Sequence, residues 1–226
     1  MTIGIEWVNN YHSASSNLSN NDKNARGFYN RLQGQRMFEY GNDLAWDQDF
    51  EEKGAGTPPA GSDQLYADHV DIVFFSGHGS RSGASFGVKT FDDGVARASN
   101  MLLGNGDLEW LVIDGCEMLA DDNGQVFSRW GWPTFRGVHY ILGFHTVAYD
   151  VKDRGEKFAD RLNQGWTVRE AWMRACIESE DSDVSYAYLR ADAAGTDTFH
   201  DHWHGKGFVS SDPRNPTVLF YLRGTC

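Results

Sequence analysis

Residues 70–80 read VDIVFFSGHGS. A mainly apolar run is followed by a short turn in which a histidine, His78, stands between two glycines. An apolar run of this length is typical of a strand buried on both faces of a parallel sheet. Residues 110–119 read WLVIDGCEML and follow the same plan, with Cys116 just after the run. In open parallel sheets, ligands bind outside the carboxyl ends of the strands. If the two strands are neighbours, His78 and Cys116 therefore emerge at the same edge.

Further apolar runs predict the rest of a central sheet. These candidate strands are residues 3–8, 138–144 and 218–222, with a weaker pattern over residues 36–46. Helical patterns fall between the strands, at residues 22–32, at residues 158–162, and after a capping box formed by Thr167 and Glu170. Strands that alternate with helices imply right-handed crossovers. We therefore expect a three-layer α/β sandwich with a mostly parallel central sheet, formed by residues 1–226 as a single domain.

The composition limits the partners of the chain. It has 20 basic and 32 acidic residues, a formal charge of −12, which disfavours nucleic acid and anionic membranes. No apolar run reaches the roughly eighteen residues of a spanning helix, and the first residues do not resemble a secretory signal. The three cysteines are odd in number and far apart, which favours reduced thiols. We expect a cytoplasmic protein without a nucleic-acid or membrane partner, and the oligomeric state stays open.

Cys116 and His78 form the candidate chemical centre. A free thiol is mostly protonated at neutral pH, and a nearby imidazole can accept its proton or stabilise the thiolate. Gly77 and Gly79 remove side chains beside the histidine, so that backbone can approach a substrate. The amides of Gly79 and Cys116 could then face a developing oxyanion. His145, which follows a later strand, is a second candidate for the base.

These two strand ends resemble the caspase–legumain–gingipain superfamily of cysteine peptidases. The likeness rests on SGHGS at residues 76–80 and on IDGCE at residues 113–117. The second motif is closer to the D-x-C form of metacaspases and the E-A-C-E form of legumains than to the Q-A-C-[RQG]-G run of caspases. The resemblance implies a caspase-like fold in which Cys116 is the nucleophile, His78 is the acid or base, and the Gly79 amide lies in the oxyanion hole.

Further side chains are predicted to bind the substrate, namely Asp114, Glu117, His145 and His12, with Tyr149 and Asp150 near the same cleft. Asp114 precedes the nucleophile by two residues, so strand alternation turns both to one face. The resemblance implies that Asp114 lines the pocket for the residue before the scissile bond; its alternative role is to cap the following turn. An acidic pocket predicts cleavage of peptides or proteins after Arg or Lys, with no cofactor or metal. In such an enzyme Cys116 forms a thioester with the substrate. Water then hydrolyses the thioester in a peptidase, whereas an amine attacks it in a transpeptidase.

Two other functions are compatible with the sequence. A non-catalytic caspase-like module would bind a partner protein, with Cys116 as an inert thiol. A zinc-dependent hydrolase would use His200, His202 and His204, because alternate residues of a strand share a face and Zn²⁺ accepts three histidines. A solvated histidine-rich loop is the simpler interpretation of that segment. Cys176 is predicted to be a core residue, because it lies on the apolar stripe of a helix.

Overall fold

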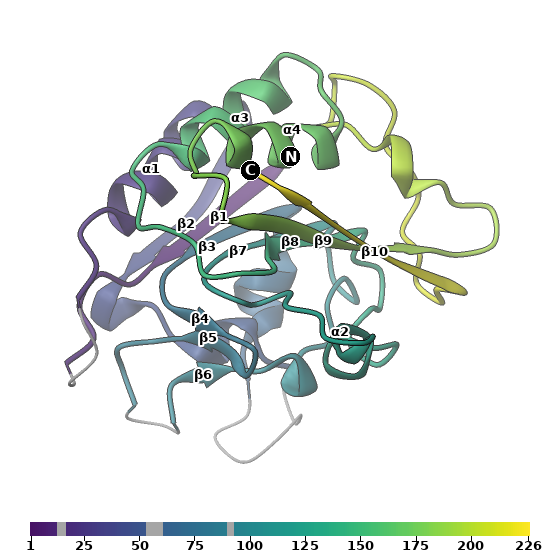
Figure 1. Ribbon diagram of the computed structural model, residues 1–226. Coiled ribbons are helices and arrows are strands. Elements are labelled where there is room, and N and C mark those ends of the chain that lie inside the picture. Colours follow the sequence, from purple (N-terminus) through teal and green to yellow (C-terminus); the bar gives the residue numbers. More distant parts are fainter. Residues whose placement is uncertain (13–16, 53–60, 90–92) are drawn as a thin grey trace.

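A computed structural model describes residues 1–12, 17–52, 61–89 and 93–226 (Figure 1). Its centre is a seven-stranded sheet in the order β10-β9-β8-β7-β3-β1-β2. The strands are β1 (Thr2–Trp7), β2 (Gln35–Gly41), β3 (Ile72–Ser76), β7 (Trp110–Asp114), β8 (Tyr140–Phe144), β9 (Ser185–Asp192) and β10 (Val218–Thr225). The first five strands are parallel to one another, while β9 and β10 are antiparallel to their neighbours. The prediction of a mostly parallel sheet is confirmed.

A layer on each face completes a three-layer α/β sandwich (Figure 1). One face carries the helices α1 (Asn21–Arg31), α3 (Arg154–Asn163) and α4 (Val168–Ile177). The other face carries the helix α2 (Gln125–Arg129) and a small sheet of β4 (Gly79–Ser80), β5 (Gly83–Ser85) and β6 (Val95–Ala96). Short 3-10 turns fill the remaining connections, at Asn42–Leu44, Asp47–Phe50, Asp63–Leu65, Ala67–His69, Ala98–Asn100 and Thr198–His200. Apolar side chains of the inner strands β1, β3, β7 and β8 are therefore buried on both faces of the sheet.

The helices follow their sequence signals. Thr167 caps α4, because its hydroxyl oxygen accepts the Glu170 amide while the hydroxyl donates to the Glu170 carboxylate at 2.6 Å. Cys176 is fully buried on the inner face of α4, as predicted. No helix of the described ranges is both long and apolar enough to cross a membrane.

The two antiparallel strands differ from the prediction. β9 was not expected, because its sequence SYAYLRAD has polar ends and an internal arginine and does not form a continuous apolar run. β10 was expected to be buried on both faces, but it lies at the edge of the sheet, with Val218, Phe220 and Leu222 exposed. An edge strand has a neighbour on one side only, here β9.

The pairing of β3 with β7 positions the candidate site. The two strands are hydrogen-bonded neighbours, and Ser76 lies opposite Asp114 at the end of the ladder. Parallel neighbours in this register deliver the turns that follow them to the same edge of the sheet. The turn with His78 and the turn with Cys116 therefore begin side by side.

Candidate active site

The turns after β3 and β7 touch through their glycines. The Gly77 amide donates to the Asp114 carbonyl oxygen at 3.1 Å. A Cβ atom on Gly79 would lie 2.8 Å from the carbonyl oxygen of Cys116, and one on Gly115 would lie 3.0 Å from that of Gly77. Any larger residue at Gly79 would push the two backbones apart. The glycines therefore bring two turns of the protein together, a role that the sequence analysis did not assign to them.

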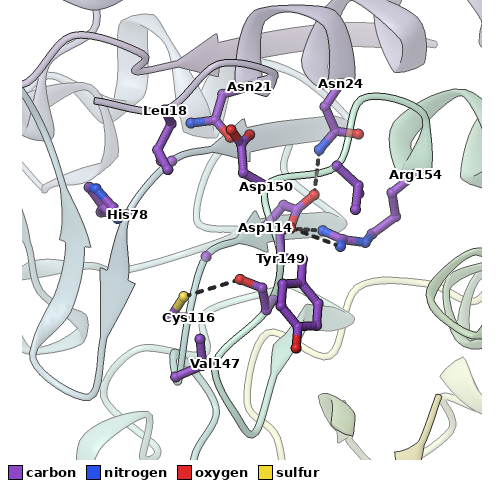
Figure 2. Close-up of a pocket in the computed structure, with 14 residues that line it drawn as sticks. Leu18, Asn21, Asn24, His78, Asp114, Cys116, Val147, Tyr149, Asp150 and Arg154 are labelled. Carbon is purple, nitrogen blue, oxygen red and sulfur yellow. Dashed lines mark hydrogen bonds and ion pairs between the residues drawn. The ribbon is translucent and has the colours of Figure 1, made fainter. Parts of the chain in front are cut away.

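His78 and Cys116 line one pocket at this edge, with a volume of about 230 Å³ (Figure 2). The opposite wall is residues 147–151, in the loop after β8, and the first turns of α1 complete the lining. Pockets that bind drug-sized ligands have volumes of roughly 300–1,000 Å³. The pocket is therefore suited to a single side chain of a larger substrate.

The Cys116 thiol is turned toward the loop after β8. It donates to the carbonyl oxygen of Ala148, with an Sγ–O distance of 3.6 Å, and Figure 2 shows this direction. A thiol has one proton, so while it donates to Ala148 it does not donate to His78. The position of His78 is fixed by Tyr11, whose hydroxyl oxygen accepts the His78 amide at 2.6 Å and whose ring centroid lies 4.6 Å from the imidazole.

A buried ion pair forms the inner end of the pocket. The Asp114 carboxylate accepts hydrogen bonds from the Arg154 guanidinium and, at 2.5 Å, from the Asn24 amide nitrogen. Arg154 also pairs with Glu180 and lies 4.6 Å from the centre of the Phe144 ring. The Arg154 side chain is only 1% exposed. Burial raises the pKa of Asp114, while Arg154 and Asn24 act against that rise.

Asp114 therefore lines the pocket but does not offer it a free carboxylate. The predicted specificity role requires an unpaired carboxylate, and the Asp114 carboxylate is already paired with Arg154. The acidic group that remains open to the pocket is Asp150, which is partly exposed. Its carboxylate accepts the amides of Ser19 at 2.7 Å and Asn20 at 3.2 Å, just before α1 begins.

Glu117 and His145 line a neighbouring depression of about 360 Å³, which shares Val147 and Tyr149 with the pocket. Glu117 has a φ of +54°, a left-handed conformation that costs a residue other than glycine roughly 1–2 kcal/mol. The chain therefore turns sharply just after the candidate nucleophile. His145 Nδ1 accepts the Asp121 amide at 3.0 Å, and His145 is not among the residues that line the Cys116 pocket. This position makes it a poor second candidate for the base.

His12 lies away from both of these pockets. Its Nε2 is 2.5 Å from the Asp43 carboxylate, and the side chains of His12 and Asp43 are 50% and 67% exposed. The preceding residue, Tyr11, is the one that contacts His78. The prediction that His12 contributes to substrate binding at the Cys116 pocket is therefore not supported by its position.

The three histidines of FHDHWHG do not converge, because a 3-10 turn and a loop replace the expected strand. His200 faces Asp197 at the surface, 4.0 Å away, and His202 contacts backbone within the loop. His204 turns inward to the amino edge of the sheet. The three-histidine zinc site is therefore wrong. A fully solvated loop is also wrong, because Trp203 in this segment is 1% exposed.

The comparison with known proteins gives a family but no activity. The sequence model of a family described as a domain of unknown function, DUF6345, matches residues 5–224. The search of curated proteins finds no match to the chain. The family match includes both turns of the candidate site.

Proposed function

The chain belongs to the DUF6345 family, and we propose that it is a cysteine peptidase with Cys116 as nucleophile and His78 as acid and base. The observation that carries the proposal is that both side chains leave the carboxyl ends of neighbouring parallel strands and line one pocket. The likeness to the caspase–legumain–gingipain superfamily is part of this proposal. A cytoplasmic location is also part of this proposal, and the three free cysteines support it.

The reaction begins when the Cys116 thiol leaves the Ala148 carbonyl and transfers its proton to His78. The sulfur then attacks the scissile carbonyl carbon, and the amides of Gly79 and Cys116 stabilise the oxyanion. His78 returns the proton to the leaving amine as the carbon–nitrogen bond breaks, which leaves a thioester. Water, activated by His78, hydrolyses the thioester and restores the thiol. An amine in place of water would make the enzyme a transpeptidase.

The charges around the pocket support a basic side chain before the scissile bond. Two carboxylates, those of Asp114 and Asp150, line the pocket with one guanidinium, that of Arg154. Arg154 is already paired with Asp114 and, outside the lining, with Glu180. Asp150 is partly exposed, so a substrate cation can reach it. A cation that enters the pocket therefore meets an excess of negative charge, which attracts Arg or Lys.

Turnover of fluorogenic peptides by single variants tests the proposal. Cys116→Ala and His78→Ala should each lower the rate by several orders of magnitude, because nucleophile and base act as a unit. Cys226→Ala is the matched control and should keep full activity, since Cys226 follows β10 and is not among the residues that line the pocket. A folded Cys116→Ala protein that retains substantial turnover would falsify the mechanism.

A binding module without catalysis is the second candidate. The hydrogen bond from the Cys116 thiol to Ala148 favours it, because that bond keeps the proton away from His78. A binding module predicts that an electrophile reacts with Cys116 equally fast whether or not His78 is present. A peptidase predicts that the reaction depends on His78, because the imidazole produces the thiolate.

A further inference from the structure

A second group of reactive side chains lies at the opposite, amino edge of the sheet. Asp71 immediately precedes β3, Glu109 immediately precedes β7, and His204 comes from the segment between β9 and β10. One potential ligand atom of each residue lies within 4.8 Å of the other two. The Glu109 amide donates to the Asp71 carbonyl oxygen at 3.0 Å, so the pairing of β3 with β7 also sets the position of this cluster.

The spacing of these atoms fits ligands that share an ion. His204 Nε2 is 3.8 Å from Asp71 Oδ1 and 3.6 Å from Glu109 Oε1. A hydrogen bond from nitrogen to oxygen requires about 2.7–3.2 Å. Two ligands at about 2.1 Å from a tetrahedral Zn²⁺ are separated by about 3.4 Å. The observed separations are too long for hydrogen bonds and close to those between two ligands of one metal ion.

Two atoms of the cluster are buried without a hydrogen bond. Among the described residues, no hydrogen-bond partner reaches Glu109 Oε2 or His204 Nε2. Buried polar atoms in proteins are nearly always bonded, so such exceptions require an explanation. A divalent cation would satisfy both atoms and balance the two carboxylates.

The surroundings hold the three side chains in place. Asp71 Oδ2 accepts hydrogen bonds from the amide and the hydroxyl of Thr2 and lies 3.9 Å from the Met1 ammonium, whereas Oδ1 faces His204. The His204 ring stands edge-on to Trp110, with 5.4 Å between centroids. Outer contacts of this kind orient metal ligands. The His204 side chain remains 30% exposed, which leaves a path for the ion and for water as a further ligand.

We infer that Asp71, Glu109 and His204 bind one divalent transition-metal ion. An imidazole with two carboxylates suits Zn²⁺ and similar ions better than Ca²⁺ or Mg²⁺, which prefer oxygen ligands. The ion ties the segment between β9 and β10 to the amino edge of the sheet. It lies at the end of β3 and β7 opposite to Cys116, so the inference does not depend on the proposed peptidase activity.

Retention of Zn²⁺ by the purified protein tests the inference. Protein stripped with a chelator is incubated with Zn²⁺, passed through gel filtration and analysed by elemental mass spectrometry. The wild type should retain one equivalent, and His204→Ala and Glu109→Gln should retain little. His200→Ala is the matched control, because His200 lies on the same segment with a side chain that is 61% exposed, and it should retain one equivalent.

Glu109→Gln separates loss of binding from loss of folding. Glutamine has the same shape and carries no charge, so the metal-free variant should melt at no lower temperature than the metal-free wild type. Zn²⁺ should raise the Tm of the wild type but not that of Glu109→Gln, because an ion that binds only the folded state stabilises it. Failure of the wild type to retain Zn²⁺, or equal retention and an equal Tm increase in Glu109→Gln, would overturn the inference.

Discussion

At the scale of single residues, Arg154 brings a buried positive charge to the inner end of the pocket. It pairs with Asp114 and Glu180, and its side chain is buried. Removing one member of a buried ion pair leaves uncompensated charge and costs about 3–5 kcal/mol. We predict a loss of this size in the free energy of unfolding for Arg154→Met, measured with urea.

An exposed ion pair provides the control for this measurement. Arg174 pairs with Glu178 on the outer side of α4, and its side chain is 49% exposed. Such surface pairs contribute about 0–1 kcal/mol. Arg174→Met should therefore unfold almost like the wild type. An equal cost for the two substitutions would show that the Arg154 pair is not a special feature of the site.

Asp150 is predicted to select basic substrates. Asp150→Asn removes the charge that meets the substrate cation, with a loss of about 1.4 kcal/mol, or about tenfold in kcat/KM, for a partly exposed pair. The loss should appear for peptides with Arg before the scissile bond and not for matched peptides with Gln. Asp153→Asn, an exposed acid paired with Lys157, is the control and should leave both substrates unaffected. Equal losses on the Arg and Gln peptides would argue against Asp150 as the specificity residue.

His78 and Cys116 could be predicted from the sequence, but the surroundings of Asp114 could not. Each of the two residues lies three positions after the last residue of an apolar run, and this pattern is local. Arg154 lies 40 residues beyond Asp114 in sequence, and Glu180 another 26 residues on. Their meeting depends on where α3 and the loop after α4 cross the edge of the sheet, which no local pattern specifies. The same holds for Tyr11, which reaches His78 across 67 residues.

At the scale of elements, the contact between the two turns is the feature to test. A Cβ on Gly79 would meet backbone atoms of Cys116 and Gly115 at 2.8 and 2.9 Å. Backbone cannot move aside as a side chain can, so Gly79→Ala should separate the turns. Misplacement of catalytic groups by about 1 Å can cost about a hundredfold in rate. We predict a loss of at least about tenfold in kcat/KM for a variant that still folds, as checked by circular dichroism.

Gly27 provides the matched glycine-to-alanine control. It lies within α1, and the nearest atom to an added Cβ is a side-chain atom of Glu156 at 3.3 Å. Alanine is also the better helix former. Gly27→Ala should therefore retain activity. Full activity in Gly79→Ala would mean that the close contact of the turns is not needed for catalysis.

The elements themselves were largely predictable where their patterns were strong. Continuous apolar runs identified β1, β3, β7 and β8, and a capping box identified the start of α4. β9 was missed because its two tyrosines and its arginine do not form an apolar run, although the strand is almost entirely buried. Burial of β9 depends on its central place between β8 and β10, which is a property of the whole sheet.

At the scale of the whole molecule, buried carboxylates should make stability fall as pH rises. Burial raises the pKa of Asp49 and of Asp68 to about 6, and that of Asp63 to about 8. In the unfolded chain these values are about 3.9, so between about pH 4 and pH 8 the folded state binds more protons. The free energy of unfolding then decreases as pH rises through this range. With a chelator present, the urea midpoint should be higher near pH 5.5 than near pH 8.

Asp63→Asn tests the origin of this dependence. The Asp63 side chain is fully buried, so its ionisation in the folded state is costly. The variant should be more stable than the wild type near pH 8, with a smaller difference near pH 5.5. A wild-type midpoint that increases with pH would contradict this account of the buried acids.

The site at which an electrophilic peptide probe reacts shows directly whether Cys116 is the nucleophile. A probe with Arg next to the electrophile is incubated with the native protein, and the modified residue is located by mass spectrometry. We predict rapid modification of Cys116, because Cys116 and His78 line the same pocket. This reaction should be lost in His78→Ala. Cys176 should remain unmodified, because it is fully buried and burial raises the pKa of its thiol. Modification at Cys176 or Cys226 ahead of Cys116, or an unchanged rate in His78→Ala, would contradict the account.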